Sequence, residues 1–557
     1  MVDSAQGQVR SLAERLRDAD DREIAALLAA RGVSAGASWH DWFDAADALL
    51  SPDSVAAAVA ALPRDALCDL ADGTGPSRLG LTDADGAPYP QACAAVTAPQ
   101  TRTPDSTPRP ASDDAAAHAA ERAFTSMSIM ADLLVECLRT PLARVGDRLA
   151  AGERRRLAAD DVVRDGDTAD LVASAAASAG LLRGDDRRWL VTSAGSEWVS
   201  AATTDRWARL VEGLRDAMPD ALRTREGGWI DPALWSGAYP LSAAWPDEAA
   251  RWSALWELAG LSADGGETPW AVALREGRSA DPTALAALLP GEVDRVFLQN
   301  DLTAISPGTL APPLDMRLRS MAVRESHAQA STYRFTEATL SASLSAGETE
   351  ASIRSFLEAL SLTGVPQPLA YLLERTAARH GLVRVGIDPG SGHTVVESAD
   401  AHILETIAVD QALRPLGLIS DGDRLRSRAD HRAVYWALSD ARYPVIAVDE
   451  SGTTLALGRD RLAPESEPAA DRYAALIARL RESEQGDAAG AWLERELAAA
   501  VKTKATLVVS VAMPDGSTRD LTLEATGLGG GRLRGLDRGA DVERTLPIRS
   551  ITAARRA

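Results

Sequence analysis

Apolar residues recur at helical spacing along most of this chain of 557 residues, and the pattern is already clear near its start. Leu12 and Leu16 lie four positions apart, and so do Ile24 and Leu28, with charged residues between them. Such spacing places the apolar side chains on one face of a helix, because 3.6 residues make one turn. Residues 1–86 are therefore predicted to form a helical domain.

Two stretches of different composition interrupt the helical pattern. Residues 87–114 are rich in proline, serine and threonine. They bury too little apolar area to offset the entropy lost on ordering, so they are predicted to be a linker. A shorter linker bounded by prolines opens residues 463–500, and the remainder of that segment is expected to be an amphipathic helical pair.

The segment 115–202 follows the order of a winged helix-turn-helix. After a first apolar helix comes a second one, which Asp167 or Thr168 is expected to cap and Gly180 to end. Two short apolar runs then flank Gly-Asp-Asp at 184–186, which is typical of a β-hairpin. The second helix carries serine and alanine where base-edge reading needs longer donors. Non-specific DNA contact and a structural or protein-binding role remain as alternatives.

Seven of the thirteen tryptophans fall within residues 203–292. Trp252 and Trp256 are four positions apart, beside Leu255, which is the spacing of a buried helix seam. Tryptophans can also stack on bases, but few basic residues interleave with these, so core packing is favoured. The region is predicted to be helical, with a second winged helix as one form that it could take.

Residues 293–390 are predicted to form a small α+β unit. Val296 to Thr303 has the pattern of a buried strand, and Thr336 is expected to cap a helix after the strand at 331–335. The next helix has apolar residues at i, i+3, i+4 and i+7, namely Ile353, Phe356, Leu357 and Leu360. A strand at 382–387 is expected to complete the unit.

The last third combines an α/β segment, 391–462, with a small β-module, 501–557. In the module, apolar runs at 507–512 and 519–524 flank Pro-Asp-Gly, a hairpin turn, and three glycines at 529–531 permit another turn. Taken with the preceding segments, these patterns predict an α+β fold. It is mostly helical and multidomain, with winged-helix units and a C-terminal β-module.

Charge and composition narrow the classes of function. A formal net charge of -21 disfavours coating of nucleic acid or binding to an anionic membrane, and leaves room for a local basic site. Three widely spaced cysteines suggest neither a disulfide framework nor a metal cluster. No run of eighteen apolar residues and no signal peptide is found, so a reducing cytoplasm, without membrane attachment, is the expected location.

No motif for catalysis, cofactor binding or metal binding stands in the sequence. A G-x-x-x-x-G-K-[ST] phosphate loop, an H-E-x-x-H pair and a G-x-S-x-G elbow are all absent. The seven histidines lie far apart in the sequence. We therefore expect no catalytic residue, no cofactor and no metal ligand, and the chain is predicted not to be an enzyme.

Two groups of arginines are candidates for contact with nucleic acid. The first lies at the hairpin predicted within 115–202 and consists of Arg183, Arg187 and Arg188. The second lies in 501–557, where ten basic and six acidic side chains leave a charge of +4. Its members are Arg532, Arg534, Arg544 and Arg549. A basic region in an acidic chain could hold an anion or single-stranded nucleic acid. A strand face with paired charges is the alternative.

Several motifs within 296–387 occur in the order found in a known helicase domain. They are QNDLT, the YRFT step from strand to helix, the L-x-x-x-L-x-x-G helix, and VPQPLAYLLE followed by His-Gly. With them, the segment resembles the N-terminal accessory domain of XPB-type helicases, which also occurs in bacterial helicase-associated proteins. The resemblance implies an XPB-like helicase as partner, in DNA repair or transcription, and implies no catalytic residue.

The β-module resembles a degenerate form of the WYL-type module of the same bacterial proteins. Gly531, Arg532 and Leu533 stand where that family has its Trp-Tyr-Leu triplet, so the aromatic pair associated with ligand sensing is missing. The favoured hypothesis is a non-catalytic accessory protein that binds the helicase, DNA, or both. The alternatives are a WYL-type transcriptional regulator sensing a ligand or nucleic acid, and a cryptic nuclease or ATPase.

Overall fold

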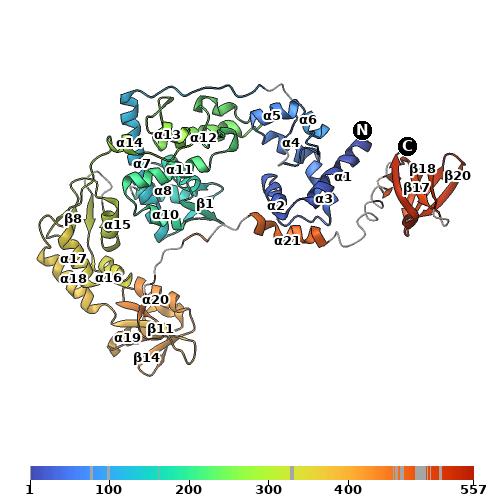
Figure 1. The fold of residues 1–557 in the computed structure, drawn as a ribbon. Helices are drawn as coiled ribbons and strands as arrows, with labels where there is room; N and C mark the ends of the chain where they lie inside the picture. Colours follow the sequence, from blue (N-terminus) through green and yellow to red (C-terminus); the bar gives the residue numbers. More distant parts are fainter. Residues whose placement is uncertain are drawn as a thin grey trace. The chain divides into compact units, whose positions relative to one another are not determined.

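Helices and, among the residues that the structure describes, five sheets make up the fold, as the computed structural model of the chain shows (Figure 1). The structure describes residues 2–75, 79–83, 85–96, 101–160, 162–325, 331–455, 457, 462–464, 469–482, 493, 497–498, 500–501, 504–513 and 517–556. About 48% of the chain is helical and about 19% is in strands, so the predicted α+β, mostly helical, multidomain class is confirmed. Among the described residues, every helix is too short or too polar to cross a lipid bilayer.

The chain divides into two compact units, each made of segments far apart in sequence. The first unit comprises residues 1–105, 236–246 and 465–557. The second unit comprises residues 106–235 and 247–464. Domain boundaries predicted along the sequence therefore do not show that residues 465–557 belong to the same unit as residues 1–105.

A helical core opens the first unit. Its helices are α1 (Val2–Asp18), α2 (Asp21–Ala30), α3 (Trp42–Leu50), α4 (Pro52–Ala60), α5 (Arg64–Ala71), α6 (Pro90–Ala94) and α21 (Ala469–Glu482). Leu12, Leu16, Ile24 and Leu28 are buried in this core, as their spacing predicts. Helix α6 lies inside the stretch predicted to be a linker, 87–114, and Ala92 is fully buried. Part of that stretch is therefore packed structure.

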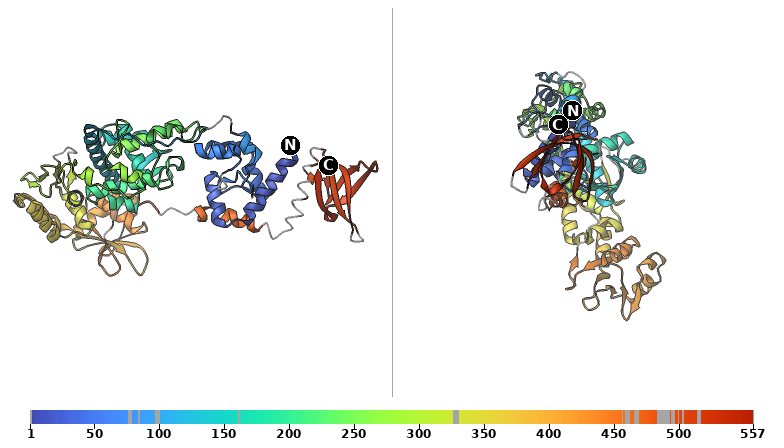
Figure 2. Two further views of the ribbon diagram at one scale, coloured as in Figure 1. Left: turned by 45° about the horizontal axis from the view of Figure 1, so that its top comes forward. Right: turned by 90° about the vertical axis from the view of Figure 1, so that its right-hand side faces the viewer.

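Helix α21 packs against the helices at the start of the chain (Figures 1 and 2). Tyr473, Leu476, Ile477 and Leu480 belong to the same buried cluster as Leu12. The Tyr473 hydroxyl donates a hydrogen bond of 2.7 Å to the carbonyl of Val33. The sequence predicts α21 as the first member of a helical pair. Residues 483–492, where most of its second member would fall, lie outside the described residues.

The second unit begins with a helix, two short strands, two helices and a hairpin, which is the order of a winged helix. These elements are α7 (Asp113–Arg139), β1 (Leu142–Val145), β2 (Arg148–Leu149), α8 (Ala151–Ala159), α9 (Gly166–Ser178), β3 (Leu182–Asp185), β4 (Arg188–Val191) and α10 (Ser193–Trp198). The strands form one sheet in the order β2-β1-β4-β3, so the predicted hairpin is confirmed.

The cap of α9 differs from the prediction. Asp165 is the N-cap residue, and its carboxylate accepts a hydrogen bond of 2.8 Å from the amide of Thr168. Asp167 and Thr168 lie inside the helix. Gly180 follows the C-cap residue with φ of 75°, a left-handed conformation that glycine adopts without strain and that ends the helix as predicted.

The tryptophan-rich region folds as helices with one short hairpin. Its elements are α11 (Thr203–Asp216), η2 (Asp220–Leu222), η3 (Pro232–Gly237), α12 (Trp245–Leu258), β5 (Ser262–Ala263), β6 (Gly266–Glu267), α13 (Ala271–Arg275) and α14 (Thr283–Ala286). Trp229, Trp235 and Trp252 meet Trp256 edge to face at ring centroid distances of 5.2, 5.1 and 5.8 Å. All four are buried, so core packing, rather than a base-stacking platform, is confirmed for them.

A second sheet and four helices follow. They are β7 (Phe297–Leu298), β8 (Thr303–Ile305), α15 (Pro312–Met321), β9 (Val323–Arg324), β10 (Thr332–Arg334), α16 (Glu337–Ser345), α17 (Glu350–Leu360) and α18 (Gln367–Arg379), with sheet order β7-β8-β10-β9. The predicted strand 296–303 is divided by a tight turn into β7 and the start of β8. Leu302 has φ of 66° there, and Asp301 accepts a 2.6 Å hydrogen bond from the Thr303 hydroxyl.

The strand expected to complete this unit belongs to the next one. Strand β11 (Val383–Ile387) lies in a six-stranded sheet of order β13-β14-β12-β11-β15-β16, where it pairs with β12 and β15. The other elements there are β12 (Thr394–Ser398), α19 (Ala401–Val409), η4 (Gln411–Leu416), β13 (Ile419–Asp421), β14 (Arg424–Ser427), α20 (His431–Asp440), β15 (Val445–Val448) and β16 (Thr454–Leu455). Apolar strands buried by helices form its core.

The C-terminal segment is a five-stranded antiparallel sheet of order β20-β19-β18-β17-β21. It consists of β17 (Thr506–Ala512), β18 (Thr518–Gly529), β19 (Arg532–Asp537), β20 (Val542–Pro547), η6 (Ile548–Ser550) and β21 (Ile551–Arg556). The predicted strands at 507–512 and 519–524 are confirmed, and β18 runs five residues further. Gly530 and Gly531 have φ of 59° and 70°, which makes the predicted glycine turn. The Pro-Asp-Gly turn at 514–516 lies outside the described residues.

Candidate functional site

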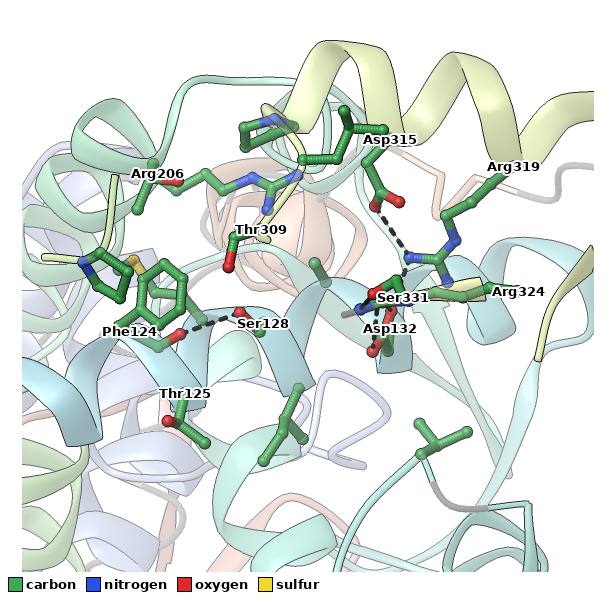
Figure 3. Close-up of a pocket in the computed structure, with 18 of the residues that line it drawn as sticks. Phe124, Thr125, Ser128, Asp132, Arg206, Thr309, Asp315, Arg319, Arg324 and Ser331 are labelled. Carbon is green, nitrogen blue, oxygen red and sulfur yellow. Dashed lines mark hydrogen bonds and ion pairs between the residues drawn. The ribbon is translucent and has the colours of Figure 1, made fainter. Parts of the chain in front are cut away.

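A pocket of about 330 Å³ lies in the second unit, between the long helix α7 and the helices α11 and α15 (Figure 3). Five arginine and aspartate side chains on its wall are buried or nearly so: Asp132, Arg206, Asp315, Arg319 and Arg324. Burial of so many charges requires that they compensate one another. Their pairing therefore decides what the pocket can bind.

Asp132 of α7 joins two arginines from the segment after 311. Its carboxylate accepts a 2.6 Å hydrogen bond from Arg319 of α15 and a 3.2 Å one from Arg324 of β9. The side chains of Asp132 and Arg319 are each 6% exposed. Arg324 also donates to the Ser331 hydroxyl at 2.8 Å. These contacts tie α7 to α15 and β9.

Asp315 continues the network one turn earlier on α15. The Tyr333 hydroxyl donates a 2.5 Å hydrogen bond to Asp315, and Arg319 lies 3.5 Å from the other carboxylate oxygen. Burial and the neighbouring Asp315 carboxylate raise the pKa of Tyr333 well above its usual value. Tyr333 therefore remains a neutral donor throughout the physiological pH range.

Arg206 stands apart from these pairs. It is 7% exposed, and its guanidinium donates to the carbonyls of Trp198 and Val199. Among the described residues, no carboxylate forms an ion pair with it. Burial lowers the pKa of Arg206 to about 10, so it is still charged at neutral pH. Figure 3 shows its guanidinium reaching toward Thr309 and Asp315.

The hairpin arginines predicted to contact nucleic acid fall into two kinds. Arg187 and Arg188 lie at the β3–β4 turn, exposed to solvent, and neither side chain has an ion-pair partner in the described part of the chain. Arg183 donates a hydrogen bond to the carbonyl of Pro464, so its charge is partly engaged. Of the three, only Arg187 and Arg188 therefore have side chains without a partner among the described residues.

The helix that would enter a DNA groove, α9, is covered. Asp167 is its only exposed residue, and the other twelve are half-buried or buried. Arg251 of α12 donates to Ser174 on the outer face of α9 at 2.9 Å. Asp170 is occupied as well, because it accepts from the amide of Leu149 at 3.0 Å. Helix α9 therefore presents an acid and no base-reading donor.

The four C-terminal arginines differ in their pairing: three have no ion-pair partner among the described residues, and one is bound to an aspartate. Arg532 and Arg534 alternate with buried Leu533 on β19, so both point to the exposed face. Arg549, in η6, is also exposed, and the three have no ion-pair partner within the described residues. Arg544 instead donates to Asp537 at 2.6 Å, an interaction that lowers the pKa of Asp537.

The buried charges of the pocket were not predicted from the sequence. Asp132 lies between Met130 and Leu133 in an apolar helix pattern, and Arg206 lies beside Trp207 in another. A charged residue on an otherwise apolar helix face was the available signal, since such a residue needs a partner when buried. The partners of Asp132, which are Arg319 and Arg324, come from a segment that no spacing rule connects to α7.

Residues 296–420 match the protein family described as "Helicase conserved C-terminal domain". The match begins at the edge of β7, crosses the second sheet and the three helices after it, and ends in β13 of the six-stranded sheet. The second unit thus contains a helicase-related domain at residues 296–420. A search of the curated proteins returned no match to the chain.

Proposed function

We propose that this protein is a non-catalytic accessory factor that binds an XPB-like helicase, DNA, or both, in DNA repair or transcription. One observation carries the proposal: a helicase-related domain at 296–420 stands in 557 residues that contain no phosphate loop. Such a loop needs lysine after glycine, and the two lysines of the chain, Lys502 and Lys504, follow Val501 and Thr503. The domain thus serves contact rather than nucleotide hydrolysis.

An exposed apolar pair on the helicase-related domain suits a protein partner. Phe297 on the edge strand β7 is 39% exposed, and Leu362 is 52% exposed. Ser361 forms a bridge with Val296, and the amide of Leu362 donates to the carbonyl of Val296 at 2.9 Å. The two apolar side chains thus occupy neighbouring positions, and we name them the edge patch. Edge strands with exposed apolar residues favour association with another chain.

The partner hypothesis is tested by mixing the purified chain with a purified XPB-like helicase. A complex in size-exclusion chromatography and a changed ATPase rate of the helicase are expected. The double variant F297E/L362E should weaken the complex at least tenfold, because it places charges in a desolvated contact. Val409→Glu, at a residue 76% exposed but outside the edge patch, is the matched control. Absence of a complex with the unaltered chain would reject this hypothesis.

The DNA hypothesis concerns the exposed face of β19. Arg532 and Arg534 on that face, and Arg549 in η6, have no ion-pair partner among the described residues, in a module whose net charge is +4 within a chain of -21. The amide of Ile548 donates to the carbonyl of Gly531 at 3.0 Å, which brings η6 beside the start of β19. Three exposed guanidiniums, two on one face of β19 and one in the neighbouring η6, suit phosphate contact more than base reading.

A salt titration of DNA binding counts these contacts. Neutralising each phosphate contributes roughly 0.7–0.9 to the slope of log affinity against log salt. R532E/R534E should reduce that slope by about 1–2 for both single- and double-stranded probes. Arg519→Glu, an exposed arginine at the other end of the sheet, should leave the slope nearly unchanged. Equal slopes in all three proteins would move the contact away from β19, with Arg187 and Arg188 as the next residues to reverse.

The second candidate function is a WYL-type transcriptional regulator. The observation that favours it is the C-terminal five-stranded sheet, whose turn and strand at 531–533 stand where that family has its aromatic triplet. A regulator predicts sequence-specific duplex binding. Selection from random duplexes would return a shared motif in that case, whereas the accessory factor proposed above would return none.

A further inference from the structure

The pocket of the second unit holds one more buried positive charge than negative. Arg206, Arg319 and Arg324 supply three guanidiniums, against the carboxylates of Asp132 and Asp315. The two aspartates are engaged by Arg319, Arg324 and Tyr333, so neither ion-pairs with Arg206. Asp315, Asp132 and Glu292 attract Arg206 from beyond ion-pair distance, and Arg319 repels it. A buried charge that no carboxylate contacts is only partly compensated, and an anion from solution would compensate it further.

We propose that this pocket binds a small organic oxyanion, a phosphate monoester or a carboxylate, with Arg206 as its counter-charge. Arg206 is the residue that fits this role, because it is more than nine-tenths buried and reaches into the pocket (Figure 3). Its planar guanidinium can donate two parallel hydrogen bonds to such a head group. The inference does not depend on the proposed helicase partner.

The N-terminus of α11 adds to the attraction. Thr203, the first residue of this 14-residue helix, lines the same pocket and is 8% exposed. The N-cap residue is Ala202, and no side chain caps the helix there. The first amides of a helix lack partners within the helix and carry partial positive charge, so an anion is favoured beside them. Arg206 lies on the first turn of this helix.

The apolar residues that line the pocket indicate that the part of the ligand beyond its charged group is apolar. Phe124 of α7, Leu310 and Pro312 line the pocket, and the hydroxyls of Ser128 and Thr309 lie among them. A volume of about 330 Å³ is at the small end of the range for ligand pockets, which is roughly 300–1,000 Å³. A metabolite-sized molecule with one charged head therefore fits better than a polymer.

Binding is tested on the full chain by isothermal calorimetry and thermal unfolding at constant ionic strength. The probes are inorganic phosphate, adenosine monophosphate and benzoate, with chloride as the reference anion. Binding of phosphate and the monophosphate without benzoate would assign a phosphate ester. Binding of benzoate alone would assign a carboxylate. Failure of all three probes to bind, or to raise Tm above the chloride reference, would overturn the proposal.

Variants locate the binding. Arg206→Met should weaken affinity for the bound probe about tenfold or more, since it removes a charge-assisted pair of hydrogen bonds. Arg209→Met, an exposed arginine on the same helix, is the matched control and should bind as the unaltered chain does. Arg206→Lys keeps the charge and serves if the methionine variant does not fold; it should bind more weakly than arginine. Unchanged affinity in both Arg206 variants would contradict the assignment.

Discussion

Asp132 links α7 to the segment that carries α15 and β9. It is 6% exposed at the side chain and accepts hydrogen bonds from Arg319 and Arg324, which lie almost two hundred positions along the chain. A carboxylate shared by two guanidiniums neutralises part of their charge. The interaction matters chiefly because its loss would leave two buried cations with less compensation.

Asp132→Asn is therefore expected to lower the free energy of unfolding of the second unit by about 3–5 kcal/mol. The asparagine keeps the size of the side chain and loses the charge. Urea denaturation measures the effect. The control is Asp147→Asn, because Asp147 also faces an arginine but is 98% exposed, and its loss should change little. Equal stability of both variants would show that the Asp132 cluster is not stabilising.

Cysteine reactivity tests burial at single positions. Cys93 is exposed, whereas Cys68 and Cys137 are buried. Burial raises the pKa of the Cys137 thiol to about 11. With a chromogenic disulfide reagent at pH 8, one thiol per native chain should react quickly and three after unfolding, because the thiolate is the reactive form.

Because the pKa of Cys137 is raised in the native chain, the free energy of unfolding should fall as the pH rises. The unfolded chain loses this proton near its ordinary pKa of about 9, before the native chain does. The stability contributed by the protonated buried thiol is therefore complete below pH 9 and falls between pH 9 and 11. Cys137→Ala should remove that part of the pH dependence, as urea midpoints across the range would show.

At the scale of elements, local signals predicted caps and turns well where the capping residue touches only its own helix. Thr336 caps α16: its hydroxyl accepts from the amide of Thr339 at 3.1 Å, and the Thr339 hydroxyl accepts from the amide of Thr336. Asp165 was missed as the cap of α9, because Asp167 and Thr168 offer similar side chains two and three positions later. Choice among neighbouring caps depends on where packing begins the helix.

Thr336→Ala is expected to lower the free energy of unfolding by about 1 kcal/mol, since the amide of Thr339 loses its acceptor, the Thr336 hydroxyl. Thr336→Ser retains the hydroxyl, so its free energy of unfolding should lie within a few tenths of a kcal/mol of that of the unaltered chain. Chemical denaturation compares the three proteins. A loss in the serine variant as large as in the alanine variant would mean that packing of the methyl group, not capping, holds this position.

Strand assignment shows why local patterns were less successful for sheets. The run Val296–Thr303 is apolar enough for one strand, yet Asp301 and Leu302 form a tight turn that divides it into β7 and β8. Strand β11 was predicted correctly as a strand, but its partners β12 and β15 follow it in the chain. Pairing depends on long-range contacts that the period of a strand does not encode.

On the scale of the whole molecule, the first unit is closed by a helix from far along the chain. Leu480 of α21 is fully buried in the core that also contains Leu12 and Ile24. The Arg479 guanidinium donates to the carbonyls of Trp39 and Ala37, which adds polar contacts beside the apolar ones. The N-terminal helices therefore need residues 469–482 to complete their core.

Leu480→Ala should destabilise these helices by about 2–5 kcal/mol through loss of buried area and formation of a cavity. Amide hydrogen exchange should increase in α1 to α5 and remain unchanged in α7 to α18. Leu462→Ala, at a residue 45% exposed, is the control. Faster exchange throughout both units would indicate that the two units unfold as one.

The sequence by itself determined the class of fold, most helices, the C-terminal strands, the basic face of β19 and the resemblance of 296–387 to a helicase domain. These features depend on spacing, turn residues and charge within short windows. Only the tertiary structure decided that α9 is covered and that α21 belongs with α1 to α5. It also decided that Asp132, Arg206 and Arg319 meet around one pocket. Each of these outcomes depends on contacts between residues far apart in the chain, where a side chain is buried or exposed according to what packs on it.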